Sequence, residues 1–196
     1  MRRASLDDLP LVAEALARAF ERDPAWAHLL PDEASRPERL RVFFRAELAH
    51  LPRGHQVWIS EDRCGAAVWA EPERWRAPLL AVARAAPAMW RVFGRRLGLA
   101  ARSQWRTARL HPGAESHWYL HYLGVVPERQ GRGLGGRLIA PVLRRCDRES
   151  MPAFLESSTE RSGALYERHG FAVSGSFSMP GGGPPLRQMW REPLPG

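Results

Sequence analysis

The residues whose types and spacing most clearly point to chemistry form one glycine-rich segment, Gln130-Gly131-Arg132-Gly133-Leu134-Gly135-Gly136. It lies between a predicted strand and a predicted helix, so its backbone N–H groups would gather beside the positive end of the helix dipole. Glycine has no Cβ and lets a ligand approach the backbone closely. The segment is therefore typical of a pyrophosphate site, with a purely structural turn as the alternative.

Hydrophobic spacing predicts the elements that must position this turn. Helices are expected at residues 6–20, 37–51, 133–148 and 162–169. Strands are expected at 55–59, 66–70, 117–126, 152–158, 171–177 and 187–190, with a turn at 61–63 and a hairpin loop at 180–185. Asp23-Pro24 interrupts the pattern after the first helix. The order predicts an α/β (α+β) protein with a mixed central sheet.

A basic segment separates the two halves of this pattern. Residues 74–110 hold nine arginines and no acidic residue, with tryptophans and prolines among apolar positions. We expect two or three helices here, a helical basic insertion at about 72–112. Such a surface could bind a membrane or nucleic acid. We favour helices that cover the rest of the domain and expose arginine faces to solvent.

Three stretches together resemble one enzyme family. Gln130-x-x-Gly133-x-Gly135 follows Leu123-Gly124-Val125-Val126-Pro127, and Phe154-Leu155-Glu156-Ser157-Ser158 and Leu165-Tyr166-Glu167-Arg168-His169-Gly170-Phe171 come after it. Together they resemble the GNAT N-acetyltransferases over about residues 118–173. The chain is most similar to the puromycin N-acetyltransferase-like branch, with weaker similarity around Ala19-Phe20 and Val68-Trp69.

The resemblance implies a single domain spanning 1–196, with a mixed sheet whose fourth and fifth strands splay apart, helices on both faces and a helical insertion before the fourth strand. It also implies acetyl-CoA as co-substrate. The backbones of Leu123 and Val125 would face the pantetheine arm, and the Val125 N–H would meet the thioester oxygen. The pyrophosphate would lie on Gln130, Gly131, Arg132, Gly133, Leu134, Gly135 and Gly136. Ser162 stands where many relatives have an asparagine that contacts the pantetheine arm.

The implied reaction is direct attack of an amine on the thioester in a ternary complex. An alkyl amine has a pKa of ~10.4, like a lysine side chain, so a base must remove its proton. His121 is one candidate, since a neutral imidazole is a base near pH 7 and we expect it to share a strand face with Tyr119, Leu123 and Val125. Glu156 on the next strand is the rival, and a water relay fed by both is a third possibility. Tyr166 would protonate the departing thiol, whose ordinary pKa is ~8.5.

The acceptor is expected to bind among the segments of lowest resemblance. The candidates are Asp23, Trp26, His28, Phe43, Tyr119 and Tyr122. Aromatic residues suit a flat, apolar amine, but any core would contain them too. Our interpretation is an enzyme that acetylates a primary amine of a small molecule. The alternatives are a protein N-terminal or lysine acetyltransferase, and a non-catalytic CoA-sensing or nucleic-acid-binding module.

Composition sets the remaining expectations. The formal net charge is +8, and all 29 basic side chains are arginines. Cys64 and Cys146 stand outside any ligand spacing, so we expect neither a disulfide framework nor a metal. No signal peptide or apolar span is recognisable, which favours a cytoplasmic protein with no membrane partner. We expect a monomer or homodimer and do not favour a nucleic-acid partner.

Overall fold

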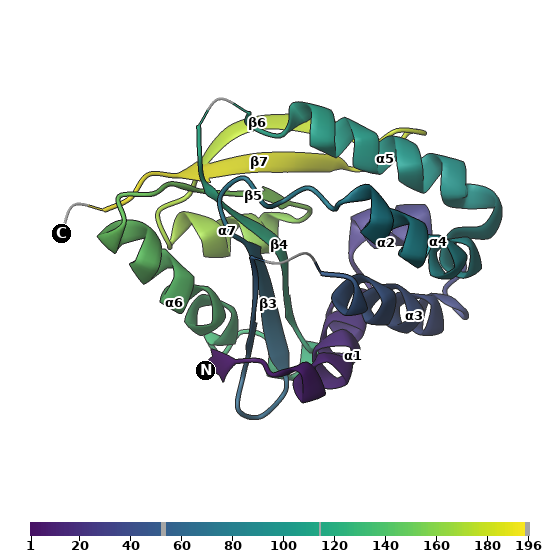
Figure 1. Cartoon of the computed structure of the whole chain (residues 1–196), viewed down its shortest axis with the longest axis horizontal. Helices are drawn as coiled ribbons and strands as arrows, with labels where there is room; N and C mark the ends of the chain where they lie inside the picture. The colour runs from purple at the N-terminus through teal and green to yellow at the C-terminus, as the bar shows by residue number, and fades with distance from the viewer. Residues whose placement is uncertain (52–53, 114, 195–196) are drawn as a thin grey trace.

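A seven-stranded mixed sheet forms the centre of the molecule (Figure 1). The computed structural model describes residues 1–51, 54–113 and 115–194. The strands follow the order β1-β2-β3-β4-β5-β7-β6. Their bounds are β1 Arg2–Arg3, β2 His55–Ile59, β3 Gly65–Ala70, β4 Trp118–Val125, β5 Ala153–Ser157, β6 Ala172–Ser178 and β7 Pro185–Arg191. The β4–β5 pair is parallel and the other described pairs are antiparallel.

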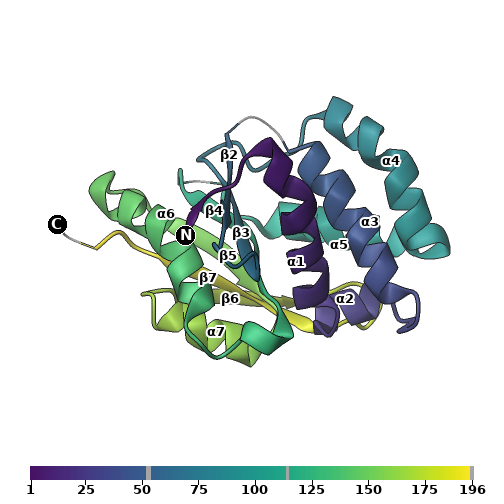
Figure 2. The same ribbon diagram turned by 90° about the horizontal axis from the view of Figure 1, so that it is seen from below.

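Helices cover both faces of the sheet. Figure 2 shows α6 on one side of β3 and β4 and α1 with α3 on the other. The α-helices are α1 Leu9–Phe20, α2 Pro24–Leu29, α3 Arg36–Ala49, α4 Leu79–Phe93, α5 Leu97–Leu110, α6 Leu134–Arg148 and α7 Glu160–Glu167. Short 3-10 turns occur at Leu6–Asp8, Gly94–Arg96 and Pro127–Arg129. The mixed sheet with helices on both faces confirms the predicted fold class.

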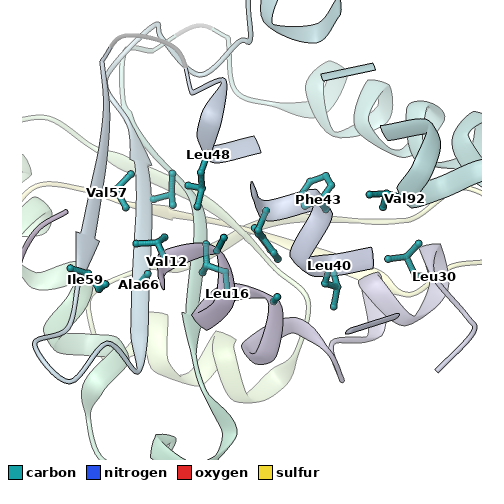
Figure 3. Packing of buried hydrophobic residues seen from close by; sticks show 14 of the residues in the cluster. Val12, Leu16, Leu30, Leu40, Phe43, Leu48, Val57, Ile59, Ala66 and Val92 are labelled. Atoms are coloured by element: carbon teal, nitrogen blue, oxygen red, sulfur yellow. The ribbon is translucent and has the colours of Figure 1, made fainter. Parts of the chain in front are cut away.

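The core on the α1 and α3 side holds these helices against β2 and β3 (Figure 3). Leu16 and Leu40 are fully buried there, and burying a side chain of that size stabilises the fold by about 1.5–3 kcal/mol. Gly124 of β4 lets α1 approach closely, because a Cβ there would lie 2.8 Å from the Cβ of Ala19. α1 therefore rests directly on the strand that precedes the glycine-rich turn.

Most elements agree with the sequence pattern to within a few residues. The interruption at Asp23-Pro24 is the start of another helix, because residues 24–29 form the short helix α2 after Asp23. The Asp23 carboxylate accepts hydrogen bonds from the N–H groups of Ala25 and Trp26, and Pro24 occupies the first helical position. Asp followed by Pro is a helix start signal as well as a break. In the insertion, α4 continues through Pro87.

β4 and β5 pair only briefly before they separate. The parallel register joins Trp118 to Ala153, Tyr119 to Phe154 and Leu120 to Leu155, and goes no further. β4 nevertheless continues to Val125 and β5 to Ser157. The predicted splay between these strands is therefore present.

A bulge in β4 decides which side chains share a face. Val68 of β3 pairs with Tyr122 and Trp69 pairs with Leu120, so His121 is the extra residue. A bulge lets two successive side chains lie on one side of the sheet. His121 consequently accompanies Tyr119 and Tyr122 on the α1 and α3 side. The expectation that His121 shares a face with Leu123 and Val125 was wrong, because those two pack in the core on the α6 side.

The insertion joins distant parts of the fold. Val92 and Phe93 at the end of α4 are buried, and the Phe93 ring lies 6.1 Å from that of Phe43 on α3. Arg96 donates a hydrogen bond to the His28 carbonyl of α2, and Gln188 of β7 donates one to the Leu110 carbonyl at the end of α5. The insertion thus packs against α2, α3 and β7.

Apolar residues remain on the outside of the insertion. Leu79, Leu80, Trp90 and Trp105 are each more than half exposed. In the described part of the chain, no helix combines the length and apolar character needed to cross a membrane.

A buried histidine pair lies where α5 returns to the sheet. The Nε2 atoms of His111 and His117 are 3.0 Å apart, and His111 stacks on Trp75 with ring centroids 3.7 Å apart. Burial, with smaller contributions from His117 and Arg76, lowers the pKa of His111 to about 3. Burial also lowers the pKa of His117. Both rings are therefore neutral at physiological pH.

This pair predicts an acid-sensitive fold. In the unfolded chain His111 binds a proton below about pH 6.5, whereas in the folded protein it stays neutral down to about pH 3. Protonation therefore favours the unfolded chain. The free energy of unfolding falls by up to about 1.4 kcal/mol for each unit by which the pH decreases in this range. His111→Gln keeps a hydrogen-bonding group but removes the titration, and should flatten the slope in denaturant unfolding between pH 6.5 and 4. His50→Gln, at the end of α3, serves as the control. Equal slopes in the wild type and His111→Gln would contradict the prediction.

Candidate active site

Left-handed glycines shape the glycine-rich turn before α6. Gly131 and Gly133 have φ angles of 78° and 73°, and Gly133 is the residue that precedes the first turn of α6. Both are exposed, so the N–H groups at this end of α6 can meet an anion. A Cβ on Gly131 would lie 3.9 Å from a guanidinium nitrogen of Arg161 on α7. Arg161 is a candidate phosphate contact that the sequence patterns did not single out.

The other two glycines of the segment lie inside α6 and have a different role. A Cβ on Gly135 would come within 2.9 Å of Leu165, and one on Gly136 would overlap the ring of His169. Both positions let α6 pack closely against α7. Leu134 is buried in the core, so its predicted contact with a cofactor could come only from its backbone.

The backbone of β4 faces the splay at alternate residues. The Val126 N–H donates to the Cys64 carbonyl at 2.9 Å, with Val125 opposite Gly65. Antiparallel ladders alternate, so the N–H groups of Val125 and Leu123 point away from β3 and toward β5. The Gln130 side chain donates to the Val125 carbonyl at 2.9 Å. Gln130 therefore fastens the turn to the end of β4, while the N–H groups of Leu123 and Val125 face the gap.

Tyr166 and Asp23 approach the splay from opposite faces. Tyr166, on α7, packs edge-on against Phe171 in the core on the α6 side, and its hydroxyl forms no hydrogen bond within the described residues. Burial, and then the charge of Asp23, raise the pKa of Tyr166 well above its usual value. Asp23, across the sheet, accepts a hydrogen bond from Ser158, which follows β5. Burial raises the pKa of Asp23 despite these hydrogen bonds.

Glu156 and Tyr119 form a hydrogen-bonded pair on the α1 and α3 side. The Tyr119 hydroxyl donates to Oε2 of Glu156 at 2.8 Å, whereas the buried Oε1 has no partner among the described residues. Burial raises the pKa of Glu156 to about 7, although the tyrosine hydrogen bond opposes the shift. The pKa of Tyr119 is raised well above its ordinary value, first by burial and then by Glu156. Glu156 is thus a carboxyl that exchanges its proton near neutral pH.

His121 lies next to this pair but has a different protonation state. Its ring centroid is 4.3 Å from that of Tyr119, and its Nε2 is 3.4 Å from Nε2 of His55. Burial, and then the two neighbours His55 and His111, lower the pKa of His121 well below its usual value. His121 is therefore neutral at pH 7 and a weaker base than an ordinary imidazole.

The predicted acceptor residues divide into two groups. Tyr122 and Trp26 are half-buried beside the splay, and Tyr119 in the same region is buried. Phe43 belongs to the hydrophobic core (Figure 3), where it is 8% exposed. Its ring contacts that of Trp26. His28 is occupied elsewhere, since its Nε2 lies 2.9 Å from the Pro180 carbonyl in the β6–β7 loop.

Two predicted ligands have internal partners. The Asp23 carboxylate caps α2 and binds Ser158, so its oxygens are largely satisfied by the protein. The Ser162 hydroxyl lies 2.7 Å from that of Ser157 and 2.8 Å from that of Thr159, in a network that supports the start of α7. The geometry gives both residues a positioning role.

One acidic side chain beside the splay was missed. Glu47 on α3 is half-buried, and the Tyr122 hydroxyl forms a hydrogen bond with its carboxyl. Burial raises the pKa of Glu47. The signal was available in the sequence, because Glu47 follows Phe43 by four residues and Phe44 by three and so lies on the apolar face of its helix.

Comparison with known proteins identifies the family. A family model described as "Acetyltransferase (GNAT) family" matches residues 27–171, which is most of the chain. The chain therefore belongs to the GNAT family and is an acetyltransferase of that kind. Acetyl-CoA is the acyl donor that the family implies.

Individual relatives agree with this assignment. An uncharacterised N-acetyltransferase of Schizosaccharomyces pombe is 27% identical over 207 residues, covering 98% of this chain and 83% of the relative. A crystal structure described as histone acetyltransferase HPA2 and related acetyltransferase, from Corynebacterium glutamicum, has a TM-score of 0.73 at 24% identity and covers 100% of this chain and 96% of its own. An agmatine N-acetyltransferase has a TM-score of 0.58 at 19% identity, with 97% of each chain covered. At these identities the structural likeness establishes the fold alone.

The turn before α6 can be tested with two equivalent glycines. Gly133 and Gly182, the latter in the β6–β7 loop, both have φ of 73° and nothing within 4 Å of an added Cβ. Alanine at either position strains the backbone by roughly 1–2 kcal/mol. Gly133→Ala should weaken acetyl-CoA binding at least about 10-fold by displacing the helix-end N–H groups, as measured by calorimetry, while Gly182→Ala should leave it unchanged. Equal affinities in the two variants would argue against a phosphate site at Gly133.

Proposed function

We propose that the protein transfers the acetyl group of acetyl-CoA to a primary amine of a small molecule by direct attack in a ternary complex. One observation carries this proposal. The splay between β4 and β5 has the glycine-rich turn and Tyr166 on one side, and on the other a carboxyl, Glu156, whose pKa is about 7. The groups that hold an acyl donor and the group that activates an amine thus face one gap.

The residues present fit acetyl-CoA. The exposed turn at Gly131 and Gly133 offers N–H groups at the start of α6 for the diphosphate. The N–H groups of Leu123 and Val125 face the gap, where an extended pantetheine arm can pair like an added strand. When bound, acetyl-CoA supplies an activated acetyl thioester. The Val125 N–H is our candidate donor to the thioester oxygen, where negative charge develops.

Glu156 is our candidate general base. Near pH 7 a substantial fraction of its carboxyl is ionised, and this form can accept the proton of an ammonium group. The Tyr119 hydroxyl holds Oε2 at 2.8 Å, so Oε1 is the oxygen left to face the amine. His121 keeps a neutral imidazole beside this pair, which suits the relay role better than the base role.

Tyr166 is our candidate acid for the thiol. Its raised pKa keeps the hydroxyl protonated throughout the physiological range. A phenol of that kind stabilises the departing thiolate by donating a hydrogen bond to it and keeps its own proton, because its pKa is far above the ordinary ~8.5 of the thiol. The absence of an internal acceptor for this hydroxyl within the described chain leaves it available for the task.

The insertion supports a small acceptor over a folded protein. The 3-10 turn before α5 contacts α2 through Arg96, and α5 contacts β7 through Gln188, so the insertion extends across the side on which we place the acceptor. Proteins of similar fold include one described as a histone acetyltransferase and one that acts on agmatine, so fold alone leaves both substrate classes open. Within the family we assign the chain to the puromycin N-acetyltransferase-like branch on its sequence similarity. The substrate class is tested by measuring thiol release with a panel of amines, aminonucleosides and peptides. Activity with peptides alone would overturn the proposal of a small-molecule acceptor.

The base assignment predicts a specific pH profile. Glu156 is protonated below about pH 7, so kcat for an accepted amine should rise as the pH increases through that value. Glu156→Gln should lower kcat about 100-fold or more and remove the rise, as expected for loss of a general base. His121→Ala should retain the rise near pH 7. The proposal is contradicted if the profile follows His121 and is unchanged in Glu156→Gln.

The acid assignment predicts a loss confined to turnover. Tyr166→Phe removes one hydrogen bond to a developing charge, worth about 1.5–3 kcal/mol, so kcat should fall about 10- to 150-fold. The Kd for acetyl-CoA should change little, because the diphosphate contacts are untouched. Stopped-flow single turnovers and calorimetry measure the two quantities. Unchanged turnover would remove Tyr166 from the mechanism.

A further inference from the structure

Only about half of the acidic side chains form an ion pair within the described residues, and the unpaired ones include two beside the splay. Within the described residues, ten carboxylates lie within 4.0 Å of an arginine or amino nitrogen. Glu47 and Glu156 are not among them, although the chain has 29 arginines and a net charge of +8. Both side chains are half-buried on the α1 and α3 side of the sheet. This part of the site is therefore acidic in an otherwise basic protein.

Glu47 occupies a position where a carboxylate is unfavourable for the fold. It shares its helix face with Phe43, Phe44 and Leu48, which are buried in the core. The Tyr122 hydroxyl supplies a hydrogen bond to its carboxyl. Burying an ionised carboxyl with so few partners is costly unless a cation compensates it. No cation of the described protein is within ion-pairing distance, so a cationic ligand would stabilise the ionised form of this carboxyl.

Glu47 and Glu156 are close enough to serve one ligand. Glu156 is bound to Tyr119 and Glu47 to Tyr122, and Tyr119 experiences the charge of both carboxyls. The bulge at His121 places the two tyrosines on one face. Strands rise about 3.3 Å per residue, so these tyrosines are at most roughly 10 Å apart along β4. That is the scale of a short alkyl diamine.

We infer that the acceptor carries a second cationic group and that Glu47 binds it, which makes an alkyl diamine the substrate class. One nitrogen lies at Glu156 and is acetylated, and the other remains charged between Glu47 and the half-buried ring of Tyr122. Aromatic faces favour such a cation. This inference rests on the proposed function, because the reacting nitrogen is the one that Glu156 deprotonates. It replaces the flat, apolar amine expected from the aromatic residues.

The test compares matched amines. Thiol release is measured with acetyl-CoA and either diamines of three to six methylenes or monoamines of the same chain length. The wild type should favour the best diamine over its monoamine at least about 10-fold in kcat/KM. Glu47→Gln should lower this preference about 10-fold, mainly by raising KM for the diamine. Glu38→Gln, an exposed position on the same helix, should keep the wild-type preference.

The outcomes separate the two proposals. Thiol release with monoamines and diamines at equal efficiency overturns the role of Glu47 and leaves the acetyltransferase reaction intact. No release with any amine overturns the proposed function itself. An equal loss for both amines in a folded Glu47→Gln protein assigns Glu47 to structure and overturns the inference. If that variant does not fold, Tyr122→Phe takes its place, because loss of the hydroxyl that holds Glu47 should also reduce the diamine preference.

Discussion

The early end of the β4–β5 pairing is the constraint on which the rest of the site depends. After Leu120 and Leu155 the two strands separate, although both continue. Backbone groups that lose their neighbour inside a sheet need another partner. An extended ligand arm can supply it, and the gap also lets Tyr166 and Asp23 approach from opposite faces. A fully paired sheet would bury this backbone and separate the two halves of the chemistry.

The bulge at His121 determines which side chains of β4 lie on each face of the sheet. After the bulge, Leu123 and Val125 pack on the α6 side and hold the strand beside the glycine-rich turn. On the opposite face, Tyr119, His121 and Tyr122 contact groups whose protonation the surroundings alter. Glu156 has a higher pKa in the fold than in the unfolded chain, so it reduces stability as the pH rises from about 4.5 through 7. Such a cost is typical of a site shaped for reaction.

Much of this arrangement could be predicted from local sequence. Strongly periodic segments such as α6 and β4, and the turn at Gly131 and Gly133, carry their signals within a few residues. The bulge depends on the register with β3, and the Tyr119–Glu156 bond joins residues 37 positions apart, so neither has a local signature. Asp23-Pro24 and Glu47 did carry signals, a helix start and an acid on an apolar helix face. The first was interpreted as a break and the second was passed over among the aromatic residues.

The insertion contacts Tyr119 through aromatic rings on the face of the sheet opposite α6. His111, at the end of α5, lies edge-on to Tyr119 with ring centroids 4.7 Å apart, and Trp75 stacks on His111 from the start of the same segment. A change in α4 or α5 can therefore be transmitted through these rings to Glu156, while α6 and its turn lie across the sheet. In the function that we propose, substitutions in this peripheral helical pair would change which amine is accepted and would leave the turn before α6, where we place the acyl donor, unchanged.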